Sequence, residues 1–234
     1  MTATVIDDGQ FQYQVQFSAR RRSVALQIKQ GQLTVRAPVG ISLEEVKNLV
    51  DLKQRWIVKH LKQSIQLTKP DWLALGKLPM LGNQLSLDVR VGTKSAVALA
   101  QDTLLITVSS RCRTERRHSV MMKLIQQWYC AQALNWCCQR VRYWQEKMAL
   151  QAGDIVIGNW KAKWGYCKHN TELGFNWRLL MAPQWVADYV IVHELVHLTY
   201  FNHSAQFWQL VEHHYPDARV AERYLKQNQH WMTL

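Results

Sequence analysis

The segment His193-Glu194-Leu195-Val196-His197 places two imidazoles and a carboxylate within five residues. On a helix, residues four positions apart lie on one face, so both imidazoles can bind a single metal ion. Glu194 would then lie beside the metal, where a carboxylate can accept a proton from water. His203 follows ten residues after His193 and can supply a third nitrogen ligand. Three histidines favour Zn²⁺ and leave a fourth position open, as in catalytic zinc sites.

The flanking residues predict that this helix is packed inside a domain. From Trp185 to Leu198 the sequence is almost continuously apolar, and a helix that is apolar on most sides is buried. Histidines and a glutamate in such a helix are costly unless a partner or a metal ion compensates them. The alternative interpretation, a helix that carries two histidines by chance, does not explain how the cost of burying these polar side chains is compensated. Pro183 suits the first turn, and Asn202 and Ser204 are expected to be a left-handed cap and the next N-cap.

Two glutamates remain open as alternative third ligands. Glu212 and Glu222 lie farther along the chain, as in zinc proteases that use a distant glutamate. His203 is favoured because a turn directly after the helix needs the least rearrangement of the chain. The spacing also matches the metzincin motif H-E-x-x-H-x-x-G-x-x-H, but Tyr200 stands at the glycine position and no methionine follows closely. A metzincin is therefore rejected.

The composition is that of an ordinary globular protein. Of 234 residues, 48% are hydrophobic and 20% charged, and such a chain can form one large domain or two small ones. No apolar run reaches membrane-spanning length, and the first residues lack the pattern of a signal peptide. The five cysteines contain no C-x-x-C pair, which excludes a zinc ribbon and indicates free thiols. We therefore expect a cytoplasmic protein with no membrane contact.

The formal net charge of +12 indicates attraction to polyanions such as nucleic acid or nucleotide phosphates. An ordinary solvated basic surface is the competing interpretation. The basic residues form three clusters, namely Arg20–Arg22, Arg111 to Arg117, and Lys161 to Lys168. Trp128, Trp136 and Trp144 recur every eight residues, which is typical of a buried helix face rather than of a base-stacking surface.

Periodicity predicts an α+β fold in two parts. A β-rich N-terminal domain, residues 1–112, is expected to contain one helix, which opens with a Ser42/Glu45 capping box and runs to about residue 66. Its predicted strands cover residues 11–17, 24–28, 33–35, 85–91 and 104–108. The basic segment 109–117 marks the predicted boundary, and no internal repeat is evident.

The C-terminal domain, residues 113–234, is expected to contain a long helix, a small antiparallel sheet and the metal helix. The long helix is predicted for residues 115–150, and strands for residues 155–157, 161–166 and 173–179. A strand beside a metal cleft can bind an extended substrate by strand addition. Five residues are the candidates for substrate binding at such an edge, with an ordinary packed hairpin as the alternative: Gly174, Phe175, Asn176, Trp177 and Arg178.

Several of these segments together resemble the YgjP-like metallopeptidase family, a bacterial group of predicted metal-dependent hydrolases related to SprT-type proteases. The similar segments are Trp164–Cys167, Phe175–Leu179, Asp188–His197, Asn202–Ser204 and Phe207–Trp208, and in the N-terminal half Val35–Pro38, Trp56–Ile57 and Leu78–Gly82. The resemblance implies a minimal zincin fold, with His193, His197 and His203 as zinc ligands and Glu194 as the catalytic base. Tyr166 departs from the smaller residue that is common in the W-G-x-C run.

The expected activity is hydrolysis by a metal-activated water with Glu194 as general base. A polypeptide is the favoured substrate, in part by analogy of fold. A nucleoside triphosphate is the alternative, although no Gly-rich phosphate loop is present. A nucleic-acid-associated protease or binding module is the third possibility. Five side chains are open as the donor that stabilises the transition state: Tyr166, Tyr189, His213, His214 and Tyr215.

Overall fold

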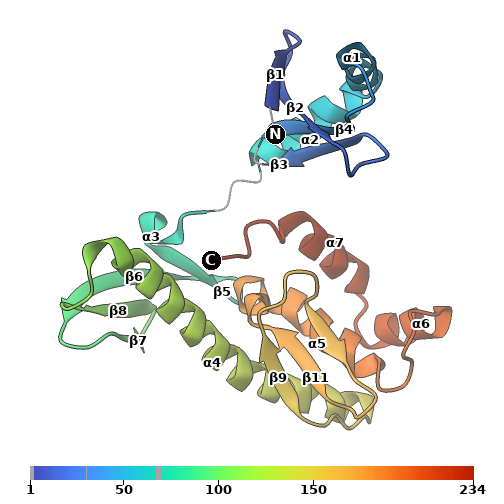
Figure 1. The fold of residues 1–234 in the computed structure, drawn as a ribbon. Coiled ribbons are helices and arrows are strands. Elements are labelled where there is room, and N and C mark those ends of the chain that lie inside the picture. The colour runs from blue at the N-terminus through green and yellow to red at the C-terminus, as the bar shows by residue number, and fades with distance from the viewer. Residues whose placement is uncertain (1–2, 30, 67–69) are drawn as a thin grey trace. The chain divides into compact units, whose positions relative to one another are not determined.

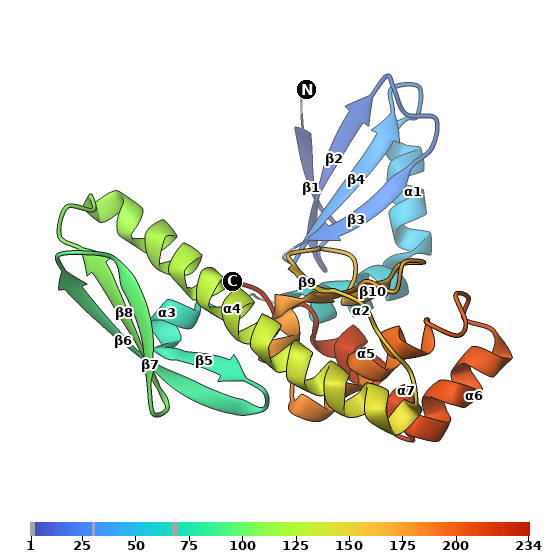
Figure 2. The ribbon, with the colours of Figure 1, turned by 90° about the horizontal axis from the view of Figure 1, so that it is seen from below.

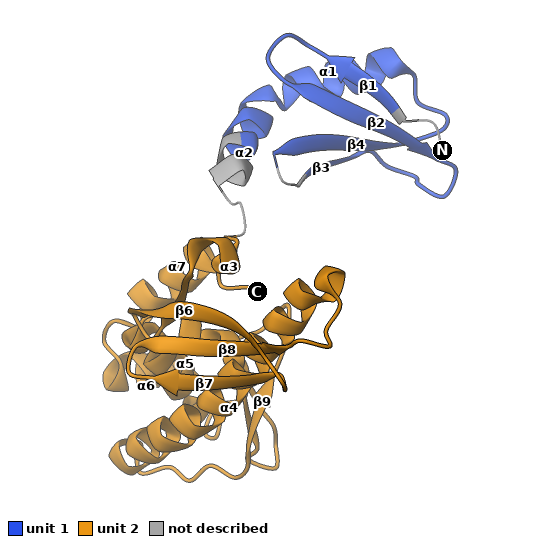
Figure 3. Ribbon diagram, turned by 90° about the vertical axis from the view of Figure 1, so that its left-hand side faces the viewer, with its two compact units in different colours: residues 1–69 blue, residues 70–234 orange. Residues whose placement is uncertain are grey.

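A computed structural model describes residues 3–29, 31–66 and 70–234. These residues form two compact units, residues 1–69 (unit 1) and residues 70–234 (unit 2), shown in Figure 3. Both units combine helices with small sheets, which confirms the predicted α+β class. No helix of the described ranges joins the length and the apolar character that a membrane crossing requires.

Unit 1 is a four-stranded sheet covered on one face by two helices. Its elements are β1 (Ala3–Asp7), β2 (Gln12–Ser18), β3 (Ala25–Lys29), β4 (Gln32–Pro38), α1 (Leu43–Leu52) and α2 (Gln54–Gln66). The strand order is β1-β2-β4-β3, with β2 and β4 parallel and the other neighbours antiparallel. Alternate residues of β4 (Leu33, Val35 and Ala37) are buried, and they pack with Val46 and Ile57 of the helices.

The predicted Ser42/Glu45 capping box is present. The hydroxyl of Ser42 accepts a hydrogen bond from the Glu45 amide at 3.2 Å, and the Glu45 carboxylate accepts one from the Ser42 amide at 2.8 Å. The helix that it opens ends at Leu52, and α2 begins at Gln54, so the single helix predicted for this segment is wrong. The break lets α1 and α2 cover one short sheet from two directions.

Unit 2 opens with a second sheet of the same strand order and directions. Its elements are α3 (Trp72–Leu75), β5 (Lys77–Met80), β6 (Asn83–Gly92), β7 (Ala96–Ala100) and β8 (Thr103–Ser109). The order is β5-β6-β8-β7, again with one parallel pair in the middle, and the β3/β4 and β7/β8 hairpins each contain five residue pairs. The two sheets are thus a structural repeat, which the sequence did not reveal.

This second sheet belongs to the core of unit 2, so the boundary predicted at residues 112/113 is wrong. Leu104 and Ile106 of β8 are fully buried in the same core as Tyr129 of the following helix, α4 (Thr114–Met148). The Tyr129 hydroxyl donates to the Pro79 carbonyl, and the Leu81 amide, at the tip of the β5/β6 hairpin, donates to the Leu180 carbonyl at 2.7 Å. The division between units follows packing and lies at residues 69/70 instead.

The rest of unit 2 surrounds one buried helix. Its elements are β9 (Ile155–Gly158), β10 (Gly165–Cys167), β11 (Leu173–Asn176), the 3₁₀ helix η1 (Trp177–Met181), α5 (Gln184–Val196), α6 (Ala205–His214) and α7 (Ala218–Asn228). Helix α5 contacts α4, η1, α6, α7 and β10, and Figures 1 and 2 show α4 running between the second sheet and the region of α5. The third sheet has the order β10-β11-β9 with β9 and β11 parallel, so it is mixed rather than antiparallel as predicted.

Candidate metal centre

The three predicted histidine ligands lie together at the end of α5. The ring nitrogens of His193, His197 and His203 that face one another are all within 4.8 Å of each other, and among the described residues these three form the cluster that could hold a metal ion. The Nε2 atoms of His193 and His203 are 3.1 Å apart. Nδ1 of His197 lies 2.8 Å from the Tyr200 carbonyl oxygen, which leaves its Nε2 for a metal. The cluster therefore fits one ion held by three imidazoles.

The turn after α5 brings His203 back to the cluster. The helix ends with His197 as its C-cap, and Ser204 is the N-cap of α6, as predicted, with its hydroxyl accepting from the Phe207 amide at 3.3 Å. The prediction of a left-handed Asn202 is wrong, because no positive φ occurs there. Its side-chain oxygen instead accepts from the Ser204 amide at 3.3 Å, and this bond closes the turn.

Burial favours the neutral form of His193 and of His197. It lowers the pKa of His193 to about 3, with a smaller contribution from His197 and His203, and it also lowers the pKa of His197. A neutral imidazole offers the lone pair that a metal needs. The lowered pKa values of His193 and His197 therefore favour binding of a metal cation over protonation.

The alternative ligands Glu212 and Glu222 have cationic partners instead. Glu212 pairs with Arg219 at 2.7 Å, and Glu222 pairs with Lys226 at 2.7 Å and with Arg219 at 3.7 Å. The Arg219 guanidinium also lies 3.7 Å from the ring centre of Trp208, and that ring stacks on His203. These contacts support His203 from behind rather than replacing it.

Glu194 lies beside the histidines and is 5% exposed. Burial raises its pKa to about 8, and the nearby charge of Lys163 lowers it. A Cβ atom at Gly165 would lie 2.6 Å from the Glu194 Oε1 atom, so only glycine leaves room for this carboxylate. Glu194 lines a hollow of about 440 Å³ together with these residues: Ala162, Trp164, Gly165, Tyr189, Val190, His193, His203, Glu222, Leu225, Lys226 and Gln229.

The strand predicted as a substrate-binding edge is in the centre of its sheet. β11 pairs with β10 on one side and with β9 on the other, and the side chains from Leu173 to Trp177 are buried. Gly174 and Phe175 therefore have no free edge, and the edge assignment is wrong. The parallel partner β9 follows the long helix, and this pairing cannot be seen in a local sequence pattern. β10 is the edge strand that contacts α5.

Asn176 and Arg178 hold the segment that forms a wall of the hollow. The Asn176 amide group donates to the carbonyls of Trp160 at 2.7 Å and Lys163 at 3.0 Å, and its backbone amide donates to the Trp164 carbonyl at 2.8 Å. Arg178 donates to the Asn159 side chain at 2.5 Å, as Trp177 does at 3.2 Å. These predicted substrate contacts thus position residues 159–164.

A buried ion pair anchors α5, and the sequence did not reveal it. Arg140 of α4 makes a bidentate pair with Asp188 at 2.6 and 2.9 Å, and the Trp144 indole donates to the same carboxylate at 3.2 Å. Asp188 is 5% exposed. Asp188 stands inside an almost continuously apolar helix, and a buried carboxylate requires a partner. This position could have indicated from the sequence that Asp188 has a cationic partner.

The five candidates for the donor that stabilises the transition state differ in their contacts. The Tyr166 hydroxyl donates to Glu172 at 2.7 Å, and the Tyr215 hydroxyl donates to the Trp185 carbonyl at 2.6 Å. Tyr189 lines the hollow, and its hydroxyl lies 3.4 Å from Nδ1 of His193. The rings of His213 and His214 meet edge to face on α6, and neither residue lines the hollow. Tyr189 is therefore the candidate that the geometry favours.

Comparison with known proteins decides the family. The model of the YgjP-like metallopeptidase domain matches residues 22–228. The chain belongs to the YgjP-like family. YgjP-like membership places it among metal-dependent peptidases, and the match spans both units. A search of curated proteins found no match.

A solved structure described as the metallopeptidase zymogen abylysin of Pyrococcus abyssi is also similar. It shares 20% sequence identity with this chain and covers 42% of it and 99% of its own chain, with a TM-score of 0.37. A similarity at this level carries no argument about the site.

Proposed function

We propose that this YgjP-like protein is a zinc-dependent peptidase with Glu194 as its general base. The observation that carries the proposal is a buried carboxylate directly beside three converging imidazoles, all of which line or adjoin one open hollow. His193, His197 and His203 would hold the ion. When bound, Zn²⁺ supplies a Lewis acid that acidifies water and polarises a substrate carbonyl.

The residues of the chain perform the proton transfers. Glu194 accepts a proton from the attacking water and delivers it to the leaving amine. The positive charge of Lys163 lowers the pKa of Glu194 and so favours the ionised form that a base requires. Tyr189, which lines the hollow, is the proposed donor to the developing negative charge.

The free edge of β10 is the proposed binding strip for an extended polypeptide. The Trp164 carbonyl accepts from the Asn176 amide, and the Lys168 amide donates to the Glu172 carbonyl, so these residues face β11. Successive residues of a strand point their backbone groups to opposite sides, and Gly165 and Cys167 therefore face away from β11. A substrate strand paired there lies next to Glu194, which contacts Gly165.

Two alternatives have less support. A nucleoside triphosphate would need cations to hold its phosphates, but the guanidinium of Arg178 is bonded to Asn159 and stacks on Trp177. A purely nucleic-acid-binding role would leave the convergence of three histidines and Glu194 unexplained. Both alternatives are outcomes of the experiment that follows.

The test is a hydrolysis panel with zinc-loaded protein and a Glu194→Gln control. Casein is compared with the four ribonucleoside triphosphates under the same conditions. We expect cleavage of casein by the wild type and none by the variant. Phosphate or pyrophosphate release that depends on Glu194, without cleavage of casein, would contradict the peptidase proposal and establish a nucleotide hydrolase.

A further inference from the structure

Unit 1 carries a dense positive charge. Residues 1–69 contain eleven Lys and Arg against five Asp and Glu. Residues 70–234 contain eighteen Lys and Arg against twelve Asp and Glu. Both units thus have the same excess of positive charges, but unit 1 has fewer than half as many residues as unit 2. The positions of these cations in unit 1 therefore indicate where an anionic ligand could bind.

Three of the five carboxylates of unit 1 close turns or cap a helix. Asp7 accepts from the amide of Gly9 at 2.9 Å, and Asp8 accepts from the amides of Gln10 and Phe11 at 3.0 Å. Glu45 belongs to the capping box of α1. In the described part of unit 1, no Lys or Arg has a carboxylate within ion-pair distance, whereas unit 2 contains six such pairs.

Two of the unpaired guanidinium groups line one hollow at a corner of the sheet. This hollow of about 300 Å³ is bounded by Gln16, Phe17, Ser18, Arg21 and Arg36. It lies where β2 and β4 end side by side, with Gln16 opposite Arg36. Nε of Arg21 donates to the Ser23 carbonyl at 3.3 Å, which fixes the direction of this side chain.

The hollow opens on the face of the sheet that no helix covers. Val35 and Ala37 are buried under α1 and α2, so Arg36 between them projects from the opposite face. Figure 2 shows α1 behind the sheet. Gln14, Gln16 and Thr34 share the outer face with Arg36, and they can donate hydrogen bonds to an anionic ligand.

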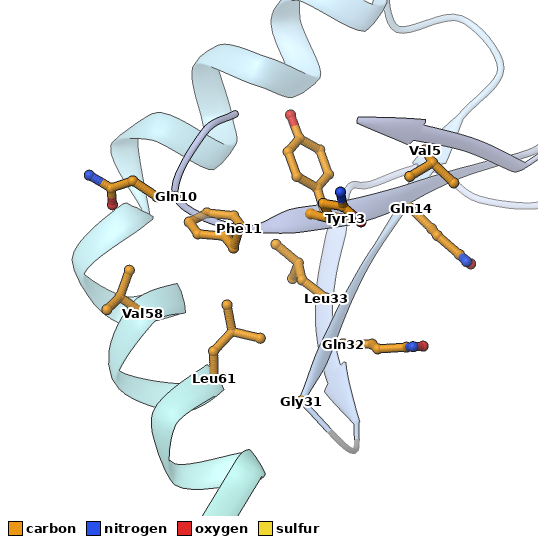
Figure 4. A pocket seen from close by; sticks show the side chains of 11 residues that line it. Val5, Gln10, Phe11, Tyr13, Gln14, Gly31, Gln32, Leu33, Val58 and Leu61 are labelled. Atoms are coloured by element: carbon orange, nitrogen blue, oxygen red, sulfur yellow. The ribbon is translucent and has the colours of Figure 1, made fainter. Parts of the chain in front are cut away.

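A second hollow of unit 1 has the opposite character. Figure 4 shows it between the sheet and α2, with an apolar lining that includes Phe11, Leu33, Val58 and Leu61. Glutamines stand at its margin, and no cation belongs to its lining. Of these two hollows, the one at the corner with Arg21 and Arg36 is therefore the one that suits an anion.

We propose that this corner binds the phosphate backbone of nucleic acid. Two guanidinium groups around one hollow repel each other until an anion lies between them, and arginine suits phosphate oxygens because it donates two parallel hydrogen bonds. The exposed Arg20 and Arg22 extend the charge beyond the hollow, as a ligand with repeated phosphates requires. This function is separate from the metal centre and does not depend on it.

The test uses the full-length protein and a fluorescein-labelled 20-nucleotide single strand, measured by anisotropy between 50 and 200 mM salt. The variant is Arg21→Gln with Arg36→Gln, and the matched control is Lys47→Gln with Lys59→Gln. The control removes the same charge from exposed positions on α1 and α2. We expect the first variant to weaken binding about tenfold at low salt and to reduce the slope of log K against log salt by about one to two. The control should stay within about twofold of the wild type.

Other outcomes have defined meanings. An equal loss in both variants, or no binding by the wild type at 50 mM salt, would overturn the proposed site. Phosphatidylserine vesicles are a second probe, and binding of vesicles but not of the strand through Arg21 and Arg36 would overturn nucleic acid as the ligand. If the double variant fails to fold by circular dichroism, Arg20→Gln with Arg22→Gln on the exposed loop repeats the test. Casein cleavage should be unchanged in all these variants.

Discussion

The two four-stranded sheets have the same strand order, but the helices that follow them in the chain differ. The first is followed by α1 and α2, which are short and close the core of unit 1 on one side. The second is followed by α4, a helix of 35 residues that is buried against β8 on one side and against α5 on another. The same sheet therefore becomes the support of a metal centre when its helix is long enough to bury two surfaces.

The two units also differ in how their charged side chains are paired. Unit 2 pairs the buried Asp188 with Arg140, and burial lowers the pKa of His193 and of His197. In the part of unit 1 that the structure describes, no cation has a carboxylate within ion-pair distance, and Arg21 and Arg36 line one hollow. We expect changes at the paired, buried positions to have large effects and equivalent changes at exposed positions to have small ones.

The largest expected effect follows from breaking the buried pair. Asp188→Ala leaves Arg140 without its carboxylate, and losses of this kind cost about 3 kcal/mol of unfolding free energy. Urea unfolding measures the change. Asp88→Ala removes an exposed ion pair with Arg90 on the repeated sheet, and we expect a loss of less than about 0.5 kcal/mol. Equal losses would show that Asp188 does not anchor α5.

A methyl group next to Glu194, the proposed general base, should have the second largest effect. Gly165→Ala places a Cβ atom 2.6 Å from Glu194 Oε1 and should displace the carboxylate. Casein cleavage should fall about 30-fold, equivalent to about 2 kcal/mol, while zinc is retained. Gly40→Ala is the control, because nothing lies within 4 Å of a Cβ at that position in unit 1. Unchanged cleavage by Gly165→Ala would mean that Glu194 tolerates displacement.

Removing the amide of Asn176 should loosen the wall of the hollow without touching the metal ligands. Asn176→Ala frees the carbonyls of Trp160 and Lys163. We expect KM for a peptide to rise about tenfold with a smaller change in kcat, unchanged zinc content, and faster hydrogen exchange at residues 160–165. A loss of zinc together with activity would indicate a general defect of folding instead.

The smallest effect concerns the pH profile. Lys163 lowers the pKa of Glu194, which burial raises. Without that positive charge the carboxylate protonates more readily, so Lys163→Met should move the acid limb of kcat/KM to higher pH. Lys161→Met removes the same charge from the same segment and should leave the limb in place. A shift to lower pH would contradict the electrostatic role of Lys163.

Local patterns predicted the elements that carry the site. The long helix was predicted for residues 115–150 and occupies Thr114–Met148, and the apolar run around His193 is the buried α5. These features depend on residues that are near one another in the chain, so periodicity and capping residues reveal them.

Features that depend on distant contacts were missed. The central position of β11 depends on β9, and the unit boundary depends on the packing of β8 against α4. Asn176 was predicted to contact substrate, but its partners are carbonyls of a loop earlier in the chain. Such pairings are decided by tertiary packing, which local propensity does not encode.

The most direct test of the central claim measures zinc content and casein cleavage on the same preparations of three proteins. The wild type should bind one zinc ion and cleave casein. Glu194→Gln should bind one zinc ion and fail to cleave, and His203→Ala should lose both zinc and cleavage. A Glu194→Gln protein with wild-type cleavage, or a His203→Ala protein with full zinc content, would contradict the assignment of these residues.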